Sequence, residues 1–253
     1  MRHLNWTVTP LSHNWAVTEA VIFDFYGTLA HWGDTTASYT TVFSSFGYEP
    51  ASLVLDGYFS RYDGVDHAEH SISEDAYEAW VRWRLAELSA ACGVRDEHME
   101  AVVDGLRDLD QSPMEAYREA EGTLRSLRAS GIAIGVCSNW GWELDAYLEE
   151  VGLLGLVDSS VTSARAGSRK PHPGIYARSI GALGVDPAEV VFVGDSWEPD
   201  VRGPRRLGMT AVHVWRADER AGQVAPVLEP GDHRVAELTG VLPIVGGVGA
   251  AVS

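Results

Sequence analysis

The chain has 253 residues, of which 45% are hydrophobic and 22% are charged. This composition is typical of a folded globular protein and excludes disordered, collagen-like and membrane-embedded classes. The formal net charge is −17, and an acidic surface repels the phosphate backbone that supplies most nucleic-acid affinity, so we expect no nucleic-acid partner. A small anionic substrate is still compatible with this charge, because a metal ion or a few placed cations reverse the field locally.

Cysteine usage and hydrophobic runs bear on the compartment. Cys92 and Cys137 are the only cysteines, and Cys137 lies in the apolar run IAIGVCS, which is typical of a buried strand. Such sparse usage favours a reducing compartment. Residues 1–20 carry no signal-peptide pattern, and no apolar run is long enough to span a bilayer. We therefore expect a cytoplasmic protein with no membrane partner, either a monomer or a homodimer.

The first predicted element is a buried strand over residues 20–25, since AVIFDF combines β-branched and aromatic residues and a glycine turn follows. Residues 34–111 break this pattern, because they lack clear strand signals and are rich in helix formers. Ser71 and Glu74 form a capping-box pattern within this interval. The apolar residues that follow at helical spacing are Tyr77, Val81, Leu85 and Leu88. The interval therefore predicts a helical insertion.

Further strands are predicted after the insertion, and they alternate with amphipathic stretches. The strands are expected over residues 132–138, 157–163, 190–195 and 210–215, and the helices over 142–151 and 174–183. The C-terminal stretch LPIVGGVGAAVS has too many glycines for a stable helix and is expected to be frayed. The predicted fold is α/β, with a Rossmann-like, doubly wound parallel-sheet core (1–33 and 112–253) and a small α-helical cap domain (34–111).

A carboxylate follows the first predicted strand. Asp24 lies near the end of VIFDF, with Gly27 in the turn after it, where an open α/β sheet presents its ligands. Such a carboxylate can attack an electrophile and form a covalent intermediate. A single aspartate at this place more often caps the next turn, so the interpretation depends on what the other strands bring to the same edge.

Polar side chains also follow the later strands. Ser138 and Asn139 come at the end of the strand after the insertion and suit hydrogen bonding to an anionic group. Lys170, in the segment SRKPHPGIY, could neutralise charge on a transferred group. The segment VFVGDSWEPD places Asp195 and Asp200 after a further strand. Each residue alone is more often a cap or a solvated charge, so the combination carries the argument.

Together these segments resemble the four signature motifs of the haloacid dehalogenase superfamily of hydrolases. DFYGTL, VCSN, the Lys170-Pro171 pair and GDSWEPD stand in the family's order, and the helical insertion lies where the family's first subclass carries its cap. The resemblance implies that Asp24 is the nucleophile and that Lys170 balances charge. It implies that anionic substrate oxygens are bound by Thr28, Ser138 and Asn139. Mg2+ would be bound by Asp24, Asp195 and the backbone carbonyl of Tyr26, while Asp200 would support metal-bound waters or Lys170.

One position departs from the family's phosphatases. They carry a second aspartate two residues after the nucleophile, which acts as general acid and base, whereas this chain has Tyr26. A phenol with a pKa of ~10 is a poor base at neutral pH, and losing a general acid–base costs about two to four orders of magnitude in rate. Tyrosine at this place is similar to the haloacid dehalogenases, which attack carbon without a metal. Tyr176 and Arg61 are candidate matches to other dehalogenase residues.

Asp195 favours the opposite interpretation. A buried pair formed by Asp24 and Asp195 would repel without a cation, and two such oxygen ligands suit Mg2+ that keeps several waters. We therefore predict a magnesium-dependent phosphatase that acts on a small phosphorylated metabolite through an aspartyl-phosphate, with Asp24, Tyr26 and Lys170 as catalytic residues. The alternatives are a metal-independent 2-haloacid dehalogenase and a low-activity binding or scaffold protein of the same fold.

Two further sets of residues are candidates for the region around the site. The histidines that could supply the missing proton are His31, His67, His70 and His172. The tryptophans that closely follow motif segments are Trp32, Trp140, Trp142 and Trp197. If the motif loops converge, these rings form an aromatic mouth for a bulky or apolar substrate; otherwise they pack the insertion against the core.

Overall fold

The computed structural model describes residues 18–32, 38–61, 64–109, 113–220 and 222–246. Its centre is a six-stranded parallel sheet with the strand order β5-β4-β1-β6-β7-β8. The strands are β1 (Ala20–Phe23), β4 (Ala133–Ser138), β5 (Ser159–Thr162), β6 (Val190–Gly194), β7 (Thr210–Val214) and β8 (His233–Val235). The five predicted strands are confirmed with slightly shorter ends, whereas the edge strand β8 was not predicted.

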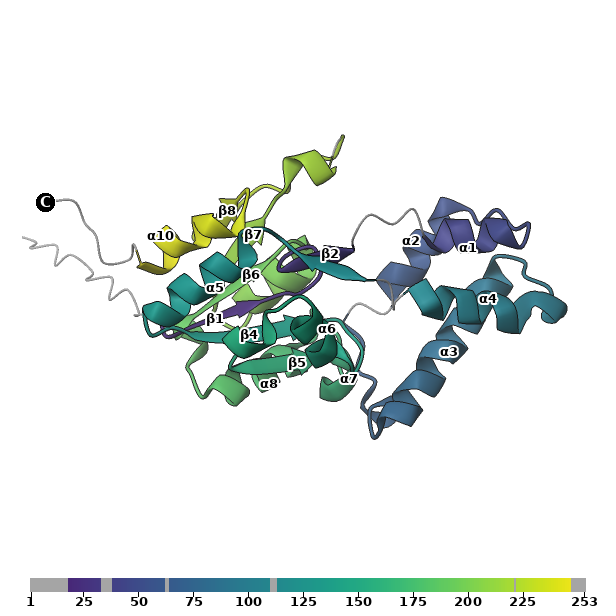
Figure 1. The fold of residues 1–253 in the computed structure, drawn as a ribbon, viewed down its shortest axis with the longest axis horizontal. Helices are drawn as coiled ribbons and strands as arrows, with labels where there is room; N and C mark the ends of the chain where they lie inside the picture. Colours follow the sequence, from purple (N-terminus) through teal and green to yellow (C-terminus); the bar gives the residue numbers. More distant parts are fainter. Residues whose placement is uncertain (1–17, 33–37, 62–63, 110–112, 221, 247–253) are drawn as a thin grey trace, which may run out of the picture.

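Helices cover both faces of the sheet, which makes it doubly wound (Figure 1). One face packs against α5 (Ala120–Ala129), α6 (Leu144–Glu150) and α10 (Val241–Gly246). The other face packs against α8 (Pro173–Leu183). The short helices α7 (Ser163–Ala166) and α9 (Gly203–Arg205) lie in connections between strands, and a π-helix precedes α9 at Trp197–Arg202. The predicted Rossmann-like α/β core is therefore confirmed.

The C-terminal prediction is wrong for part of its range. α10 includes residues 242–246, which were expected to be frayed. The helix forms because Val241 is fully buried and Leu242, Ile244 and Val245 pack against the core of that face, and this packing offsets the low helix propensity of glycine. Residues 247–253, like the N-terminal arm at 1–17, lie outside the described residues.

The position of β1 decides where the site forms. Phe23 pairs with Val136 of β4 on one side and with Val193 of β6 on the other. All four residues of β1 are buried, so apolar packing fixes the strand in this central place. The chain segments that leave β1, β4 and β6 at their carboxyl ends therefore emerge side by side, which is the edge where open α/β sheets bind ligands.

A small antiparallel pair, β2 (Ala30–Trp32) and β3 (Met114–Ala116), flanks the insertion and was not predicted. Between them lie α1 (Tyr39–Ser45), α2 (Ser52–Arg61), α3 (Glu74–Ala91) and α4 (Asp96–Leu109). These helices lie together to one side of the sheet (Figure 1). They share a hydrophobic cluster of their own, to which Phe43, Leu85 and Leu106 contribute fully buried side chains.

The predicted capping box of α3 is wrong by two residues. Ser73 is the N-cap, and its hydroxyl accepts a hydrogen bond from the backbone N–H of Ala76 at 3.1 Å. Ser71 instead contacts Nδ1 of His67 at 3.0 Å. Serine is a good N-cap at either position, so the sequence pattern alone could not choose between Ser71 and Ser73.

The insertion is tied to the segment that carries Lys170. Backbone hydrogen bonds run from His67 N–H to Gly167 O at 2.7 Å and from Arg169 N–H to Val65 O at 3.0 Å. A weaker bond joins Gly64 N–H to Lys170 O at 3.3 Å. Residues 64–67 therefore run alongside residues 167–170, and this contact holds the segment between α2 and α3 against the core.

Two findings concern the predicted compartment. Among the helices that the structure describes, none is long and apolar enough to cross a membrane. Cys92 and Cys137 are both free thiols, and Cys137 is buried in β4 as predicted.

Candidate active site

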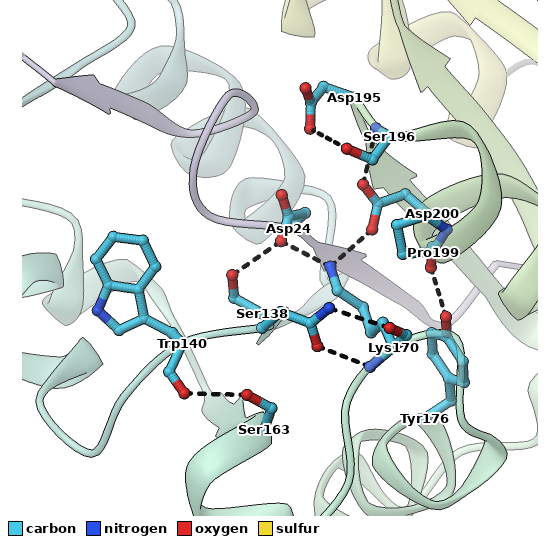
Figure 2. A network of polar contacts seen from close by, with 11 residues as sticks. Asp24, Ser138, Trp140, Ser163, Lys170, Tyr176, Asp195, Ser196, Pro199 and Asp200 are labelled. Carbon is cyan, nitrogen blue, oxygen red and sulfur yellow. Dashed lines mark hydrogen bonds and ion pairs between the residues drawn. The ribbon is translucent and has the colours of Figure 1, made fainter. Parts of the chain in front are cut away.

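Asp24 lies immediately after β1 and is nearly buried. Its Oδ1 atom accepts a hydrogen bond from the hydroxyl of Ser138 at 2.9 Å and another from Nζ of Lys170 at 2.7 Å (Figure 2). Ser138 ends β4, and Lys170 follows α7, so three predicted site residues meet from separate elements. Both contacts fall on one oxygen, which holds the carboxylate in a fixed orientation.

Lys170 is the charged centre of this network, and it is the only lysine in the sequence. The residue is 2% exposed, and its Nζ atom also lies 2.6 Å from Oδ1 of Asp200. Burial alone would lower the pKa of Lys170, but the carboxylates of Asp200 and Asp24 outweigh it and raise that pKa above its usual range. Lys170 therefore stays protonated and acts as a permanent cation between two acids.

Asp195 and Asp200 complete a group of three carboxylates with Asp24. One oxygen from each of the three lies within 4.8 Å of the others. Burial and the nearby charge of Asp24 raise the pKa of Asp195 to about 6. Burial raises the pKa of Asp200 to about 8, since the repulsion from Asp24 and Asp195 adds to it and Lys170 offsets only part of it. Asp195 and Asp200 therefore hold protons more tightly than free aspartate does, as expected where negative charge is in excess.

A second cation, Arg220, was missed by sequence reasoning. Its guanidinium forms a short ion pair with Oδ2 of Asp195 and donates to the backbone carbonyl of the same residue at 3.0 Å. Cζ of Arg220 also lies 4.8 Å from the ring centroid of Trp215. The buried ring of His213 contacts the Asp195 carbonyl at 3.0 Å as well. Arg220 follows the last predicted strand in the charged stretch ADER, and no motif distinguishes it there.

The carboxylate cluster fits a magnesium ion in its chemistry. Oxygen donors are the ligands that Mg2+ prefers, and the three acids face two cations within the described part of the chain, Lys170 and Arg220. With all three acids ionised, the formal charges sum to −1, and the raised pKa values of Asp195 and Asp200 report the same excess of negative charge.

The turn after Asp24 brings the backbone of Gly27 close to the carboxylate of Asp195. Gly27 has φ +79°, and a Cβ atom there would lie 2.8 Å from Cγ of Asp195, so only glycine fits. Thr28 is fully buried, and its hydroxyl has no hydrogen-bond partner among the described residues. Buried hydroxyls are rarely left in this state, so Thr28 Oγ1 is suited to an oxygen of a bound anion.

Tyr26 lies at the open side of this turn and is 44% exposed. Its ring centroid is 5.6 Å from that of Trp32 and 6.5 Å from that of Trp140. Burial raises the pKa of Tyr26 above its usual value, and the charges of Asp195 and Glu219 raise it further. The phenol therefore remains protonated at neutral pH and can donate a hydrogen bond, but it is not suited to act as a base.

Asn139 lies beside Ser138 but contacts the backbone of Lys170. Its Nδ2 donates to Lys170 O at 3.1 Å, and its Oδ1 accepts from Lys170 N–H at 2.7 Å. The predicted role of Asn139 in substrate binding stays a prediction. The observed pair of hydrogen bonds indicates that the amide holds the lysine segment in place.

A cavity of about 230 Å³ lies next to these residues, between the core and the insertion. We call it the aromatic cavity, because five of its lining side chains are the rings of Trp32, Tyr39, Tyr58, Tyr77 and Trp140. Its charged lining residues are Arg84, Arg107, Arg169 and Glu143. The cavity reaches the catalytic edge through Asn139 and Trp140, which directly follow Ser138.

The four tryptophans are divided among three environments. Trp32 and Trp140 line the aromatic cavity, with ring centroids 5.8 Å apart. Trp142 packs on the hydrophobic cluster of Tyr77, Trp80 and Ala164. Trp197 contacts the ring of His213 at 5.4 Å. The predicted aromatic mouth is therefore formed by two of the four residues and by tyrosines from the insertion.

The histidines and the dehalogenase-like residues take up other positions. His31 contacts Tyr117, His67 and His70 stack on Trp80, and His172 caps α8. Burial lowers the pKa of His67 to about 4, so it is neutral at physiological pH. Tyr176 is fully buried and donates to the carbonyl of Pro199. Arg61 lines a different cavity, formed by α2 and α3.

Known proteins resemble this chain over much of its length. The chain is 33% identical over 154 residues to haloacid dehalogenase-like hydrolase domain-containing protein 3 of Bos taurus, covering 60% of this chain and 61% of the relative. It is 32% identical over 149 residues to a phosphoserine phosphatase of Thermus thermophilus (58% and 59%) and 32% identical over 139 residues to (S)-2-haloacid dehalogenase 4A of Burkholderia cepacia (53% and 59%). The chain thus spans less than two thirds of each relative.

A crystal structure of a HAD phosphatase from Thermococcus onnurineus has the same fold, with a TM-score of 0.57 and 26% identity over 90% of this chain and 98% of that one. A family model described as haloacid dehalogenase-like hydrolase matches residues 18–208, which is most of the chain and includes all four motif segments. The protein therefore belongs to the family of haloacid dehalogenase-like hydrolases.

Proposed function

We propose that the protein is a magnesium-dependent phosphohydrolase that acts on a small phosphorylated compound. The observation that carries the proposal is the cluster of Asp24, Asp195 and Asp200, whose oxygens lie within 4.8 Å of one another and whose charge exceeds that of Lys170 and Arg220. A divalent cation would balance this excess. The similarity to proteins named as phosphatases supports the proposal.

In the proposed reaction, a carboxylate oxygen of Asp24 attacks phosphorus while the ester P–O bond breaks, and the leaving alkoxide oxygen takes a proton from water to become the alcohol. Lys170 stabilises the charge on Asp24 and on the transferred group, and Ser138 and Thr28 hold phosphoryl oxygens. When bound, Mg2+ would neutralise phosphate charge at Asp24 and Asp195. Water then attacks phosphorus of the aspartyl-phosphate, releasing phosphate and restoring the carboxylate.

Tyr26 limits the rate in this proposal. It can donate a hydrogen bond to the leaving oxygen, but its raised pKa makes it unable to activate water at neutral pH. We therefore expect slow turnover with poor leaving groups and faster turnover with good ones, such as aryl or acyl phosphates.

A specific observation also favours the second candidate, hydrolytic dehalogenation of a 2-haloacid without a metal. Arg220 already places a cation on Asp195, and Tyr26 stands where an acid–base aspartate is expected in a phosphatase. The similarity to a named haloacid dehalogenase supports this alternative. A third candidate is a protein of the same fold that binds ligands with little turnover.

Parallel assays separate the three. We expect Mg2+-dependent phosphate release from an aryl phosphate, loss of that release in Asp24→Asn, and normal release in the control Asp104→Asn, whose side chain is exposed on α4. Chloride release from 2-chloropropionate in the presence of a chelator would establish the dehalogenase instead. Neither product, together with tight anion binding, would favour the binding protein.

The remaining sequence-based assignments belong to the same proposal. We propose that the insertion acts as a cap domain over the site, that the substrate is small and anionic, and that nucleic acid and membranes are not partners. A cytoplasmic location is supported by the two free thiols, and a monomer and a homodimer are both compatible with the proposal.

A further inference from the structure

The aromatic cavity has walls from both parts of the molecule. The core contributes Trp32 and Trp140, and the insertion contributes Tyr39, Tyr58 and Tyr77. Its volume of about 230 Å³ exceeds the roughly 150 Å³ that suffices to bind benzene in an apolar protein cavity. Aromatic walls favour flat apolar groups, because rings stack on rings with geometric preference as well as burial. The cavity therefore has the size and the lining for a substituted aromatic ring.

The charge of the cavity is opposite to that of the whole molecule. Three arginines and one glutamate line it, although the chain carries a formal net charge of −17. Arg84 is 7% exposed, and its guanidinium stacks 4.6 Å from the ring centroid of Trp80 and 5.3 Å from that of Tyr58. Arg107 is held by Glu78 at 2.8 Å and by Glu143 at 3.5 Å. Glu78 and Glu143 therefore balance the charge of Arg107. Arg84 is the cation that its ring contacts keep in place, and a fixed cation in an aromatic setting favours an anionic ligand.

The cavity also adjoins the reacting carboxylate. Ser138 contacts Asp24, and the next two residues along the chain, Asn139 and Trp140, line the cavity. The ring of Trp140 faces Tyr26, two residues after Asp24, with a centroid distance of 6.5 Å. A phosphoryl group on Asp24 would therefore direct the rest of its substrate toward the cavity.

We propose that the aromatic cavity binds the leaving group of the substrate, and that this group is an aromatic ring carrying an anionic substituent such as a carboxylate. The inference rests on the phosphohydrolase activity proposed above and names its substrate class. The rings of Trp140 and the insertion tyrosines hold the aromatic part, and Arg84 attracts the anionic part.

Three esters with alcohol leaving groups of similar basicity test the substrate class, since differences in their rates then report binding rather than bond strength. They are butyl phosphate, benzyl phosphate and para-carboxybenzyl phosphate. We expect kcat/KM to rise roughly tenfold from butyl to benzyl through added apolar contact. A further rise of about tenfold is expected from benzyl to para-carboxybenzyl, because a hydrogen bond to a charged group adds to binding.

Variants assign the effect to the cavity. Arg84→Met keeps an unbranched apolar stem between Tyr58 and Trp80, and we expect it to raise KM about tenfold for the para-carboxybenzyl ester only. Arg82→Met is the control, since Arg82 lies on the same helix but pairs with Asp104 outside the cavity. Trp140→Leu should raise KM for both aromatic esters and not for butyl phosphate. Trp83→Leu, at an exposed site on α3, should leave all three unchanged.

The outcomes distinguish this inference from the function on which it rests. Equal kcat/KM for the three esters would overturn the substrate class while leaving the phosphohydrolase intact. If neither these esters nor the aryl phosphate is hydrolysed, the proposed function fails. In that case, fluorescence titration with benzylphosphonate and butylphosphonate decides whether the cavity selects an aromatic ligand. Equal affinities for the two would overturn the proposed preference of the cavity for an aromatic group.

Discussion

The guanidinium of Arg220 forms an ion pair with the carboxylate of Asp195, so the acid proposed to bind a metal is already paired with a cation of the protein itself. The two groups are largely but not fully shielded from water, with 25% and 19% of their side chains exposed. A metal ion and Arg220 would compete for the same carboxylate, because both are attracted by its negative charge.

The first prediction follows from this competition. Arg220→Gln removes the competing cation, and we expect it to tighten Mg2+ binding by about tenfold, the effect of losing one charge-assisted hydrogen bond at a partly exposed site. Isothermal titration of the protein with MgCl2 measures this directly. The control is Arg206→Gln, whose side chain pairs with Glu198 at the surface. An unchanged affinity in Arg220→Gln would show that the ion pair does not oppose metal binding.

Lys170 supports the second prediction. Lys170→Met leaves Asp24 and Asp200 buried without their shared cation, and breaking a buried ion pair in this way costs about 3–5 kcal/mol of unfolding free energy. Urea denaturation of the metal-free protein measures the loss. The double variant Lys170→Met with Asp24→Asn should recover part of it, because the stranded charge on Asp24 is removed. No recovery would mean that Lys170 stabilises the fold by packing rather than by charge.

The pKa of Asp195 leads to a pH dependence. Its usual value is 3.8 and its value in the folded protein is about 6, so the folded state binds a proton more tightly than the unfolded state. The resulting stabilisation is fully present below pH 3.8 and is lost as pH rises to about 6, at about 1.4 kcal/mol for each pKa unit. In a chelator, the unfolding free energy of the wild type relative to Asp195→Asn should therefore fall over this range. If the difference in unfolding free energy between the two proteins does not change with pH, the raised pKa of Asp195 is contradicted.

Tyr26 can be converted to the residue that phosphatases of the family are expected to carry. We expect Tyr26→Asp to raise kcat for an alkyl phosphate, with an upper limit of about two to four orders of magnitude, because a carboxyl group can protonate the leaving oxygen and then activate water. Tyr26→Phe removes only the hydroxyl and serves as the matched control. If Tyr26→Asp brings no gain, another group already provides the proton.

Gly27 gives a geometric prediction. Gly27→Ala places a methyl group 2.8 Å from Cγ of Asp195 on a backbone with φ +79°, so the carboxylate must move. We expect Mg2+ affinity to fall by at least about tenfold and unfolding free energy to fall by about 1 kcal/mol or more. Gly47→Ala is the control, since Gly47 has φ +82° but nothing within 4 Å of its added Cβ. Similar metal affinity in both variants would contradict the close approach.

Most of the sheet could be predicted from sequence because its strands are continuous apolar runs. β1 and β6 are buried along their whole length, so hydrophobicity alone marks them. The site residues could be predicted for the same reason, since Asp24, Ser138 and Asp195 stand where those runs end. Strand order then brings them together without further information.

The features that were missed depend on contacts between distant segments. β2 and β3 are three residues each and pair across the whole insertion, so neither has a local pattern. β8 is a short edge strand with the sequence HRV, two of whose three residues are polar. Arg220 lies in a charged stretch that resembles any solvated turn. Its role is visible only once β7 places that turn beside Asp195.

The single lysine gives the molecule one ε-amine, buried between two acids. Amine-directed reagents should therefore react slowly with Lys170 in the folded protein, since a protonated and enclosed amine is a poor nucleophile. Acylation of Lys170 would require the segment 167–170 to move away from the site and the ammonium to lose its proton. Its rate, read by mass spectrometry, would measure how often the catalytic edge opens.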